Sequence, residues 1–401
     1  MAIATGTATV VQERSATPRL STTAPAKEAE FPDIKAIKDS IPDHCFESSV
    51  ATSMGYVARD AALAAALYYA ALTYIPQVEN NYLRYTAWMV YGYAQGLIGT
   101  GIWILAHEAG HGAFSRYQKL NDFVGWVLHS YLLVPYFSWQ SSHRRHHQFT
   151  GNMEKDMVFV PAVYNSERHH KEPTTPWGIM AHAMEDVPAY QLLTLVFHQL
   201  FGWQLYLLAN VSAGRESLPR KEGRWYRLSH LDPFGDLFRP REAILVIMTD
   251  IGLAITMGVL YLAAQSIGWS RVFLLYGVPY FWVHHWLIAI TYLHHNHPSV
   301  YHYSRDGWTF VKGALSTIDR DFGWVDRHLF HGIIGTHVVH HLFPRIPFYK
   351  AEEATAAMKP LLGDLYHYEG SSFMSQLWQT FTTCKYVEEN PQIPGQMRWK
   401  K

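Results

Sequence analysis

The sequence predicts an all-α membrane protein, with four transmembrane helices in two hairpins beneath a helical cap. Three observations support this prediction. Of the 401 residues, 49% are apolar, 15% are aromatic and only 16% are charged, whereas soluble domains carry about 25% charged residues. The apolar residues are gathered into long runs, and histidines cluster beside these runs at spacings typical of helices.

Four apolar runs reach the length of about 20 residues that a membrane-spanning helix needs. The first of them spans the membrane only if Arg59 and Asp60 lie at the interface. Two further apolar runs, 122–137 and 190–209, are interrupted by polar residues, so we expect interfacial or buried helices there. The predicted spans are 54–76, 85–106, 244–265 and 272–293.

Two hairpins return the chain twice to the side on which it began, so every histidine cluster is expected on one membrane face. The two short loops on the opposite side, 77–84 and 266–271, hold one arginine each. The positive-inside rule therefore places the clusters, the cap and both termini in the cytosol. Basic residues on the cluster side are Arg116, Lys119, Arg144, Arg145, Arg239 and Arg241.

The domain organisation predicted from composition is simple. Residues 1–45 are expected to be a mostly disordered tail, 46–370 the membrane domain and 371–401 a C-terminal tail. The net charge of zero gives no indication of nucleic-acid binding. The two cysteines, Cys45 and Cys384, exclude a disulfide framework.

The 24 histidines indicate a metal centre because three groups of them repeat helical spacings. Imidazoles at positions i, i+3 and i+4 share one face of a helix. Two groups have the pattern H-x-x-H-H, and the third has the pattern H-x3-H. The groups are His107 and His111; His143, His146 and His147; and His337, His340 and His341.

Eight imidazoles are too many for one tetrahedral zinc ion and suit two metal ions. Redox-active iron suits imidazole ligands, although affinity alone leaves zinc and copper open. A ninth ligand is expected in "TYLHHNHP", directly after the fourth predicted span. We favour His295 there over its neighbours His294 and His297.

The first group also matches the zinc-peptidase signature H-E-x-x-H, with Glu108 in the position of the general base. A peptidase would use His107, His111 and one more ligand, and would leave both H-x-x-H-H groups without a role. The two-metal hypothesis uses all of them. Glu108 and Asp156 are then the candidate partners that accept the second N–H of a ligand imidazole and so orient it.

Five stretches of the sequence resemble the membrane fatty acid desaturases, the histidine-box di-iron family. The resemblance covers almost the whole chain from residue 31 and is closest to the fungal ω3 and bifunctional Δ12/ω3 (Δ15) desaturases. The stretches are "HEAGHGAFS", "HRRHHQFTGN", "TYLHHNHP", "TIDRDFG" and "HVVHHLFPRIPFYKAEEA".

The resemblance implies an enzyme that uses O2 to insert cis double bonds into C18 acyl chains. The products would be α-linolenoyl from linoleoyl chains, linoleoyl from oleoyl chains, or both. It implies a multi-pass protein of the endoplasmic reticulum membrane with a cytosolic active site, and it favours a phospholipid over CoA as acyl carrier. The two iron ions would be bound by His107, His111, His143, His146, His147, His337, His340 and His341, with His295 added by its position after the fourth span.

The resemblance also implies that electrons come from cytochrome b5 and an NADH-dependent reductase. No haem-binding H-P-G-G motif occurs in the chain, so the donor would be a separate protein. A fatty acid hydroxylase on the same di-iron scaffold is the alternative, because the motifs do not distinguish the two outcomes. A metal transporter would place histidines along the spans, where only His284 and His285 occur.

Overall fold

The computed structural model describes residues 29–164, 175–219 and 227–400, so the predicted tail over 1–28 lies outside the described residues. The described chain is mostly helical. Its α-helices are α1 (Ile34–Asp39), α2 (Val50–Tyr74), α3 (Asn81–His111), α4 (Gln118–Tyr131), α5 (Tyr136–Phe149), α7 (Pro176–Met184), α8 (Pro188–Ala209), α9 (Ala243–Ile267), α10 (Trp269–Val272), α11 (Val278–His295), α12 (Phe310–Ala314), α13 (Gly323–His328), α14 (His337–Leu342), α15 (Phe348–Leu362) and α16 (Phe373–Thr383).

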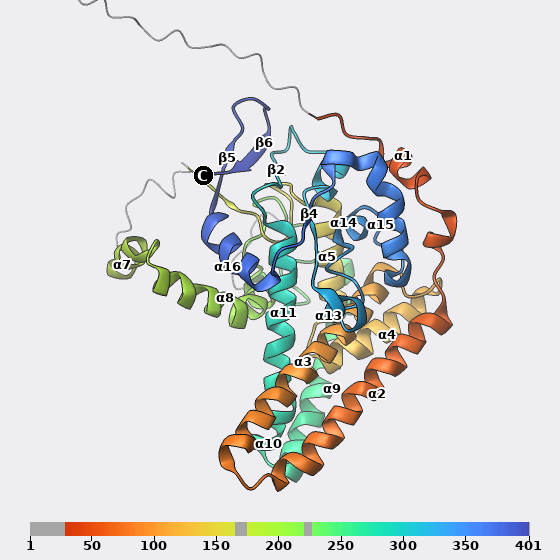
Figure 1. Ribbon diagram of the computed structural model, residues 1–401, viewed down its shortest axis with the longest axis vertical. Helices are drawn as coiled ribbons and strands as arrows, with labels where there is room; N and C mark the ends of the chain where they lie inside the picture. The colour runs from red at the N-terminus through yellow and green to blue at the C-terminus, as the bar shows by residue number, and fades with distance from the viewer. Residues whose placement is uncertain (1–28, 165–174, 220–226, 401) are drawn as a thin grey trace, which may run out of the picture.

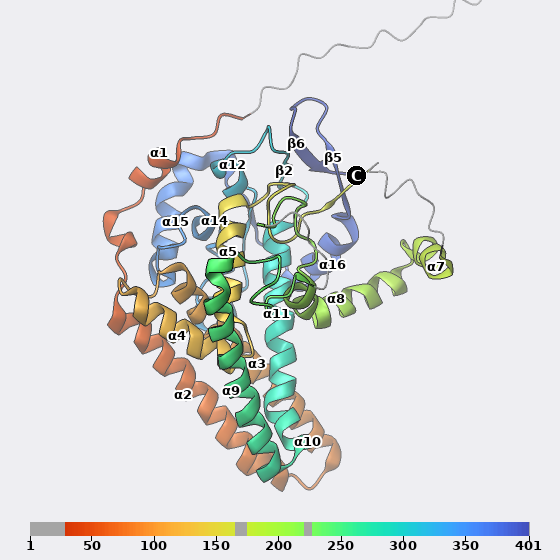
Figure 2. The same ribbon diagram turned by 180° about the vertical axis from the view of Figure 1, so that it is seen from behind.

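The long helices form a bundle, and the shorter ones form a cap at one of its ends. Figures 1 and 2 show α2, α3, α9 and α11 running together in the lower half, with α5 and α12 to α15 above them. Helices α3 and α11 approach closely because α3 presents glycines to α11. A Cβ on Gly96 would lie 2.3 Å from the Trp282 side chain, and one on Gly99 would lie 2.8 Å from Val283.

Helices occur at all four predicted spans, but three helical stretches of the described chain are long and apolar enough to cross a membrane. Two of these contain predicted spans, Pro240–Ile267 and Trp269–His295. The third is Pro188–Ala209, for which an interfacial or buried helix was expected. Helices α2 and α3 do not meet this criterion. Arg59 and Asp60 in α2, and several small or polar residues in both helices, lower their mean hydropathy.

Two small sheets depart from the all-α prediction. Their strands are only two to four residues long, too short for an alternating pattern to be visible in the sequence. The larger sheet has the order β1-β5-β6-β2, and the smaller pairs β3 with β4. The strands are β1 (Ala162–Val163), β2 (His302–Tyr303), β3 (Asp319–Arg320), β4 (Tyr368–Glu369), β5 (Tyr386–Glu389) and β6 (Gln396–Trp399).

Both segments that flank the predicted membrane domain contain ordered structure. The stretch before residue 46 includes α1 and a 3-10 turn over Asp43–Phe46, whose buried Ile37 and Cys45 pack against α15. In the stretch after residue 370, β5 pairs in parallel with β1, and β6 pairs antiparallel with β2. The C-terminal segment therefore folds back onto the cap.

Candidate metal centre

The last turn of α3 carries the first pair of histidines. The helix ends at His111 because Gly112 adopts a left-handed conformation, with φ of 75°, and its N–H bonds back to the Ala109 carbonyl. His107 and His111 lie one turn apart on the same face, and their Nε2 atoms are 3.2 Å apart. Both also lie against His340 of α14, at the end of α3 that meets the cap.

The second group lies in the last two turns of α5, and the third occupies the short helix α14. The side chain of Asp319 fixes the start of α14, because its Oδ1 accepts the backbone N–H of Val338 at 2.8 Å. Its Oδ2 accepts the Tyr366 hydroxyl at 2.6 Å. Helices α3, α5 and α14 come from distant parts of the sequence and meet with their histidine faces inward.

The first histidine cluster gathers five imidazoles whose nitrogen atoms lie within 4.8 Å of one another. His143 is central, with its Nε2 atom 3.1 Å from that of His107 and 3.1 Å from that of His147. The buried Nε2 of His340 has no hydrogen-bond partner among the described residues. The members of this cluster are His107, His111, His143, His147 and His340.

The second histidine cluster is built around His295, at the end of α11. Its Nε2 atom lies 3.3 Å from that of His146 and 3.3 Å from that of His337. His341 completes the group, with its Nε2 atom 3.1 Å from that of His337. The second cluster is therefore His146, His295, His337 and His341.

The three neighbouring candidates for the ninth ligand have different surroundings. His294 donates through Nδ1 to the carbonyl of Ile318, and its ring stacks on His337 beside the second cluster. His297 lies near the Glu369 carboxylate, 3.7 Å away. His295 is the one whose nitrogen enters the cluster, and it is also the favoured residue of the three from sequence.

The two clusters adjoin one another. The rings of His147 and His341 stack at 4.1 Å with an angle of 8° between their planes, and they belong to different clusters. All nine predicted ligand residues are thus brought together from α3, α5, α11 and α14. The arrangement thus offers two neighbouring groups of imidazoles that could each hold a metal ion.

The donor geometry suits metal ions. A metal–imidazole bond of about 2.1 Å places two ligand nitrogens at right angles about 3.0 Å apart. The Nε2 atoms of these clusters lie 3.1–3.3 Å apart. Burial lowers the pKa of His107 to about 3 and holds those of His143 and His341 well below their usual value. Neutral imidazoles with converging lone pairs repel one another unless a cation lies between them.

The two carboxylates predicted to orient ligands differ in their contacts. Asp156 Oδ1 lies 2.6 Å from Nδ1 of His146, so this carboxylate accepts an imidazole N–H. Glu108 Oε2 instead accepts the backbone N–H of Phe348 at 3.1 Å. Its Oε1 lies 3.4 Å from His107 Nδ1, which forms no hydrogen bond within the described chain. Burial raises the pKa of Glu108 to about 8.

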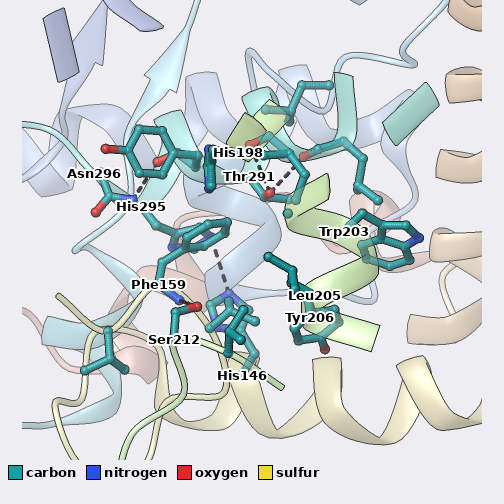
Figure 3. A pocket seen from close by; sticks show the side chains of 18 of the residues that line it. His146, Phe159, His198, Trp203, Leu205, Tyr206, Ser212, Thr291, His295 and Asn296 are labelled. Atoms are coloured by element: carbon teal, nitrogen blue, oxygen red, sulfur yellow. Dashed lines mark hydrogen bonds between the residues drawn. The ribbon is translucent and has the colours of Figure 1, made fainter. Parts of the chain in front are cut away.

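A largely apolar cavity of about 440 Å³ leads to the imidazoles (Figure 3). His146 and His295 lie on one wall, and Trp203 and Tyr206 of α8 lie on the other. The cavity runs down α3 to Thr100, which lies seven residues and roughly 10 Å before His107 along the helix. Its predominantly apolar lining suits an apolar ligand.

The role of α8 as a cavity wall was missed from the sequence. The polar residues that argued against a span also hold the helix to the protein core. Tyr206 bonds through its hydroxyl to Ser142 of α5 at 2.8 Å, and Gln204 donates to His284 of α11 at 2.7 Å. The polar residues that recur among the apolar ones of 190–209 are the feature of the sequence that could have indicated this packing.

A second cavity, lined mainly by residues of α4 and α5, reaches the clusters. Its lining is more polar than that of the first cavity. Trp139, His143 and His341 line both cavities. His143 and His341 can therefore be reached both from an apolar cavity and from a more polar one.

Comparison with known proteins agrees with this geometry. Residues 86–373 match the family model described as fatty acid desaturase. The chain is 41% identical to a Δ12 fatty acid desaturase of Mortierella alpina, over 94% of each protein. It is 40% identical to an oleate hydroxylase of Claviceps purpurea, over 90% of this chain and 78% of the relative.

A plant protein is similar to the chain to about the same degree. The chain is 42% identical to an oleoyl-12-hydroxylase of Ricinus communis, over 90% of this chain and 88% of the relative. The zinc-peptidase alternative has no support, because His107 and His111 share their cluster with three further imidazoles. The chain belongs to the fatty acid desaturase family, and it is an oxidoreductase.

Proposed function

We propose that the protein inserts cis double bonds into C18 acyl chains, at the Δ12 position, the ω3 (Δ15) position or both. The observation that carries this proposal is the junction of the apolar cavity with both histidine clusters. A saturated C–H bond has no acidity that a base can exploit, so its removal needs an oxidant generated from O2 at a redox metal. The cavity brings a hydrocarbon chain to the place where such metals would be bound.

Two irons are the proposed ions. The first cluster would bind one iron, and the second cluster would bind the other. When bound, they supply the activation of O2 that the reaction requires. The protein itself positions the substrate, because α3, α8 and α11 hold the acyl chain in one place and exclude water from it.

The ligand imidazoles are kept neutral and oriented by their surroundings. Burial keeps the rings neutral, as the lowered pKa values of His107 and His143 indicate, so each ring has one nitrogen without a proton. Asp156 accepts the N–H on the far side of the His146 ring, which fixes its tautomer and its orientation. Asp156 itself lies in the loop that follows α5.

We also propose the four-span arrangement, with α2 and α3 as one hairpin and α9 and α11 as the other. Apolar side chains exposed along α9, among them Ile251, Ile255 and Leu262, suit contact with lipid. Helix α8 leaves the bundle sideways in Figure 1, an orientation that suits the membrane interface. The proposed location is the endoplasmic reticulum, with the cap and both termini in the cytosol.

The proposed substrate is an acyl phospholipid rather than an acyl-CoA, and the proposed donor is cytochrome b5 with its NADH-dependent reductase. Removal of two hydrogens from the chain supplies two electrons, and reduction of O2 to two waters needs four. A donor must therefore deliver the other two. These assignments follow the family resemblance of the histidine boxes.

Hydroxylation of the same chains is the second candidate, since similar relatives include oleate and oleoyl hydroxylases. One experiment separates the outcomes. The protein is expressed in a yeast that makes no polyunsaturated lipids, the cells are fed oleate or linoleate, and the fatty acids are analysed by gas chromatography with mass spectrometry. We expect linoleate, α-linolenate or both. Hydroxy fatty acids as the main product would favour the hydroxylase, and no product from either acid would contradict both.

A further inference from the structure

The second cavity has no role in the function proposed so far. It has a volume of about 640 Å³ and opens beside α5 and α14. His111, His143, His147 and His341 line it, so both histidine clusters are in contact with it. The acyl chain has its own apolar approach on the other side of these imidazoles, which leaves the polar cavity for a water-soluble reactant or partner.

The charged side chains at this cavity are mostly basic. Arg144 and Arg345 line it, are exposed, and form no ion pair with any residue that the structure describes. Asp122 is the one acidic residue among the described lining residues, and Gln118 donates a hydrogen bond to it at 2.8 Å. Two exposed arginines beside buried histidines attract a negatively charged partner over several ångströms.

We propose that the mouth of this cavity is the docking site of an acidic one-electron carrier protein, bound through Arg144 and Arg345. This inference rests on the proposed function, which requires two electrons from outside. The balanced reaction is –CH2–CH2– + O2 + 2e− + 2H+ → –CH=CH– + 2H2O. The carrier is oxidised twice per turnover, and the protons come from water.

Two features of the structure favour a protein carrier over a lipid headgroup here. First, imidazoles of both clusters line the cavity, so a partner at its mouth lies beside both of them. Second, the acyl cavity and this one are distinct cavities with a shared wall of Trp139, His143 and His341, so lipid and carrier can be bound at the same time. A lipid whose headgroup occupied the polar cavity would have to approach the clusters from the side opposite the apolar cavity.

The test uses the iron-loaded full-length protein in lipid nanodiscs and the soluble haem domain of cytochrome b5 as the probe. Charge reversal by Arg144→Glu with Arg345→Glu is expected to raise the Kd for the probe, and its KM in turnover, about three- to tenfold. Asp122→Asn should shift both constants in the opposite direction. Arg327→Glu is the matched control, because Arg327 is exposed on α13 and lines neither cavity.

Iron content and thermal transition are measured for each variant. If the reversal variants lose iron, Arg144→Gln with Arg345→Gln replaces them, and the fall in probe affinity of the unmodified protein with rising salt is measured beside it. Unchanged Kd in the double variant with normal iron would overturn the docking proposal. So would a raised KM for the lipid with an unchanged Kd for the probe, which would assign the arginines to a phosphate headgroup. Binding is read without turnover, so a protein that makes no product would contradict the proposed function and still test the docking site.

Discussion

Asp156 lies 2.6 Å from His146 and also accepts the backbone N–H of Gly151, so one carboxylate orients a ligand and shapes the turn beside it. Asp156→Asn keeps the size of the side chain and removes its charge. We expect about a tenfold loss of iron affinity. Iron retained after dialysis against a graded series of chelator concentrations measures this effect.

The control for that prediction is Asp306→Asn, because Asp306 lies on an exposed loop. This variant should keep iron like the unmodified protein. Equal iron affinity in Asp156→Asn and Asp306→Asn would show that the contact with His146 has no bearing on the metal.

The three adjacent histidines after α11 give a second prediction. His295→Ala should lose the ion of the second cluster and nearly all activity, because the other three imidazoles of that cluster surround its Nε2 atom. His297→Ala should keep both ions, since its ring contacts Glu369 instead. Elemental analysis of the purified proteins gives the iron stoichiometry. A full complement of iron in His295→Ala would exclude this residue as a ligand.

Gly202 gives a third prediction, on the shape of the apolar cavity. An added Cβ there would lie 3.4 Å from His198 Cδ2 and 3.5 Å from Ile288 Cδ1, so Gly202→Ala fits with small adjustments. Gly202→Leu would extend into the cavity that both of these side chains line. We expect Gly202→Leu to lower turnover of C18 chains about tenfold or more by misplacing the chain.

Iron content and the thermal transition of Gly202→Leu should stay near those of Gly202→Ala, because the residue contacts neither cluster. Product yields from chains of different length, compared between the two variants, report the cavity depth. If Gly202→Leu processes every chain length as the unmodified protein does, α8 does not confine the substrate.

Gly101 gives a fourth prediction, on stability. A Cβ at this position of α3 would lie 2.2 Å from the backbone carbonyl of Leu329, so Gly101→Ala forces the backbone apart and should cost about 1–3 kcal/mol. Gly258→Ala is the matched control, since nothing lies within 4 Å of its added Cβ, and it should stabilise α9 by up to about 1 kcal/mol. Thermal transitions in detergent compare the two. Equal transitions would contradict the close packing of α3 against the loop before α14.

The histidine groups were predictable because their spacing alone fixes which side chains share a helix face. His107 and His111, or His143 and His147, are four residues apart, and this relation holds wherever the helix lies in the fold. The choice of His295 over His294 and His297 was harder. It depends on the direction in which the last turn of α11 faces, and that direction is set by packing against residues distant in sequence, such as Ile318.

Other parts of the fold could not be predicted from local pattern. The polar residues Gln199 and Gln204 indicated a buried or interfacial helix over 190–209, and the structure buries Gln199 and hydrogen-bonds Gln204 to a neighbouring helix, but nothing local showed that this helix would form a wall of the apolar cavity. The strands β1 and β2 have two residues each, and they exist only because the C-terminal hairpin of β5 and β6 pairs with them. Pairing between segments more than 90 residues apart in the sequence has no local signature.

That hairpin has a practical consequence for anyone who handles this protein. Lys385 and Trp399 line the apolar cavity although both belong to the last seventeen residues of the chain. A purification tag or fluorescent protein fused to the C-terminal hairpin would lie close to the apolar cavity. A protein shortened before this hairpin would leave one wall of the cavity open to solvent. Labels for imaging or capture are therefore better attached away from the C-terminal hairpin.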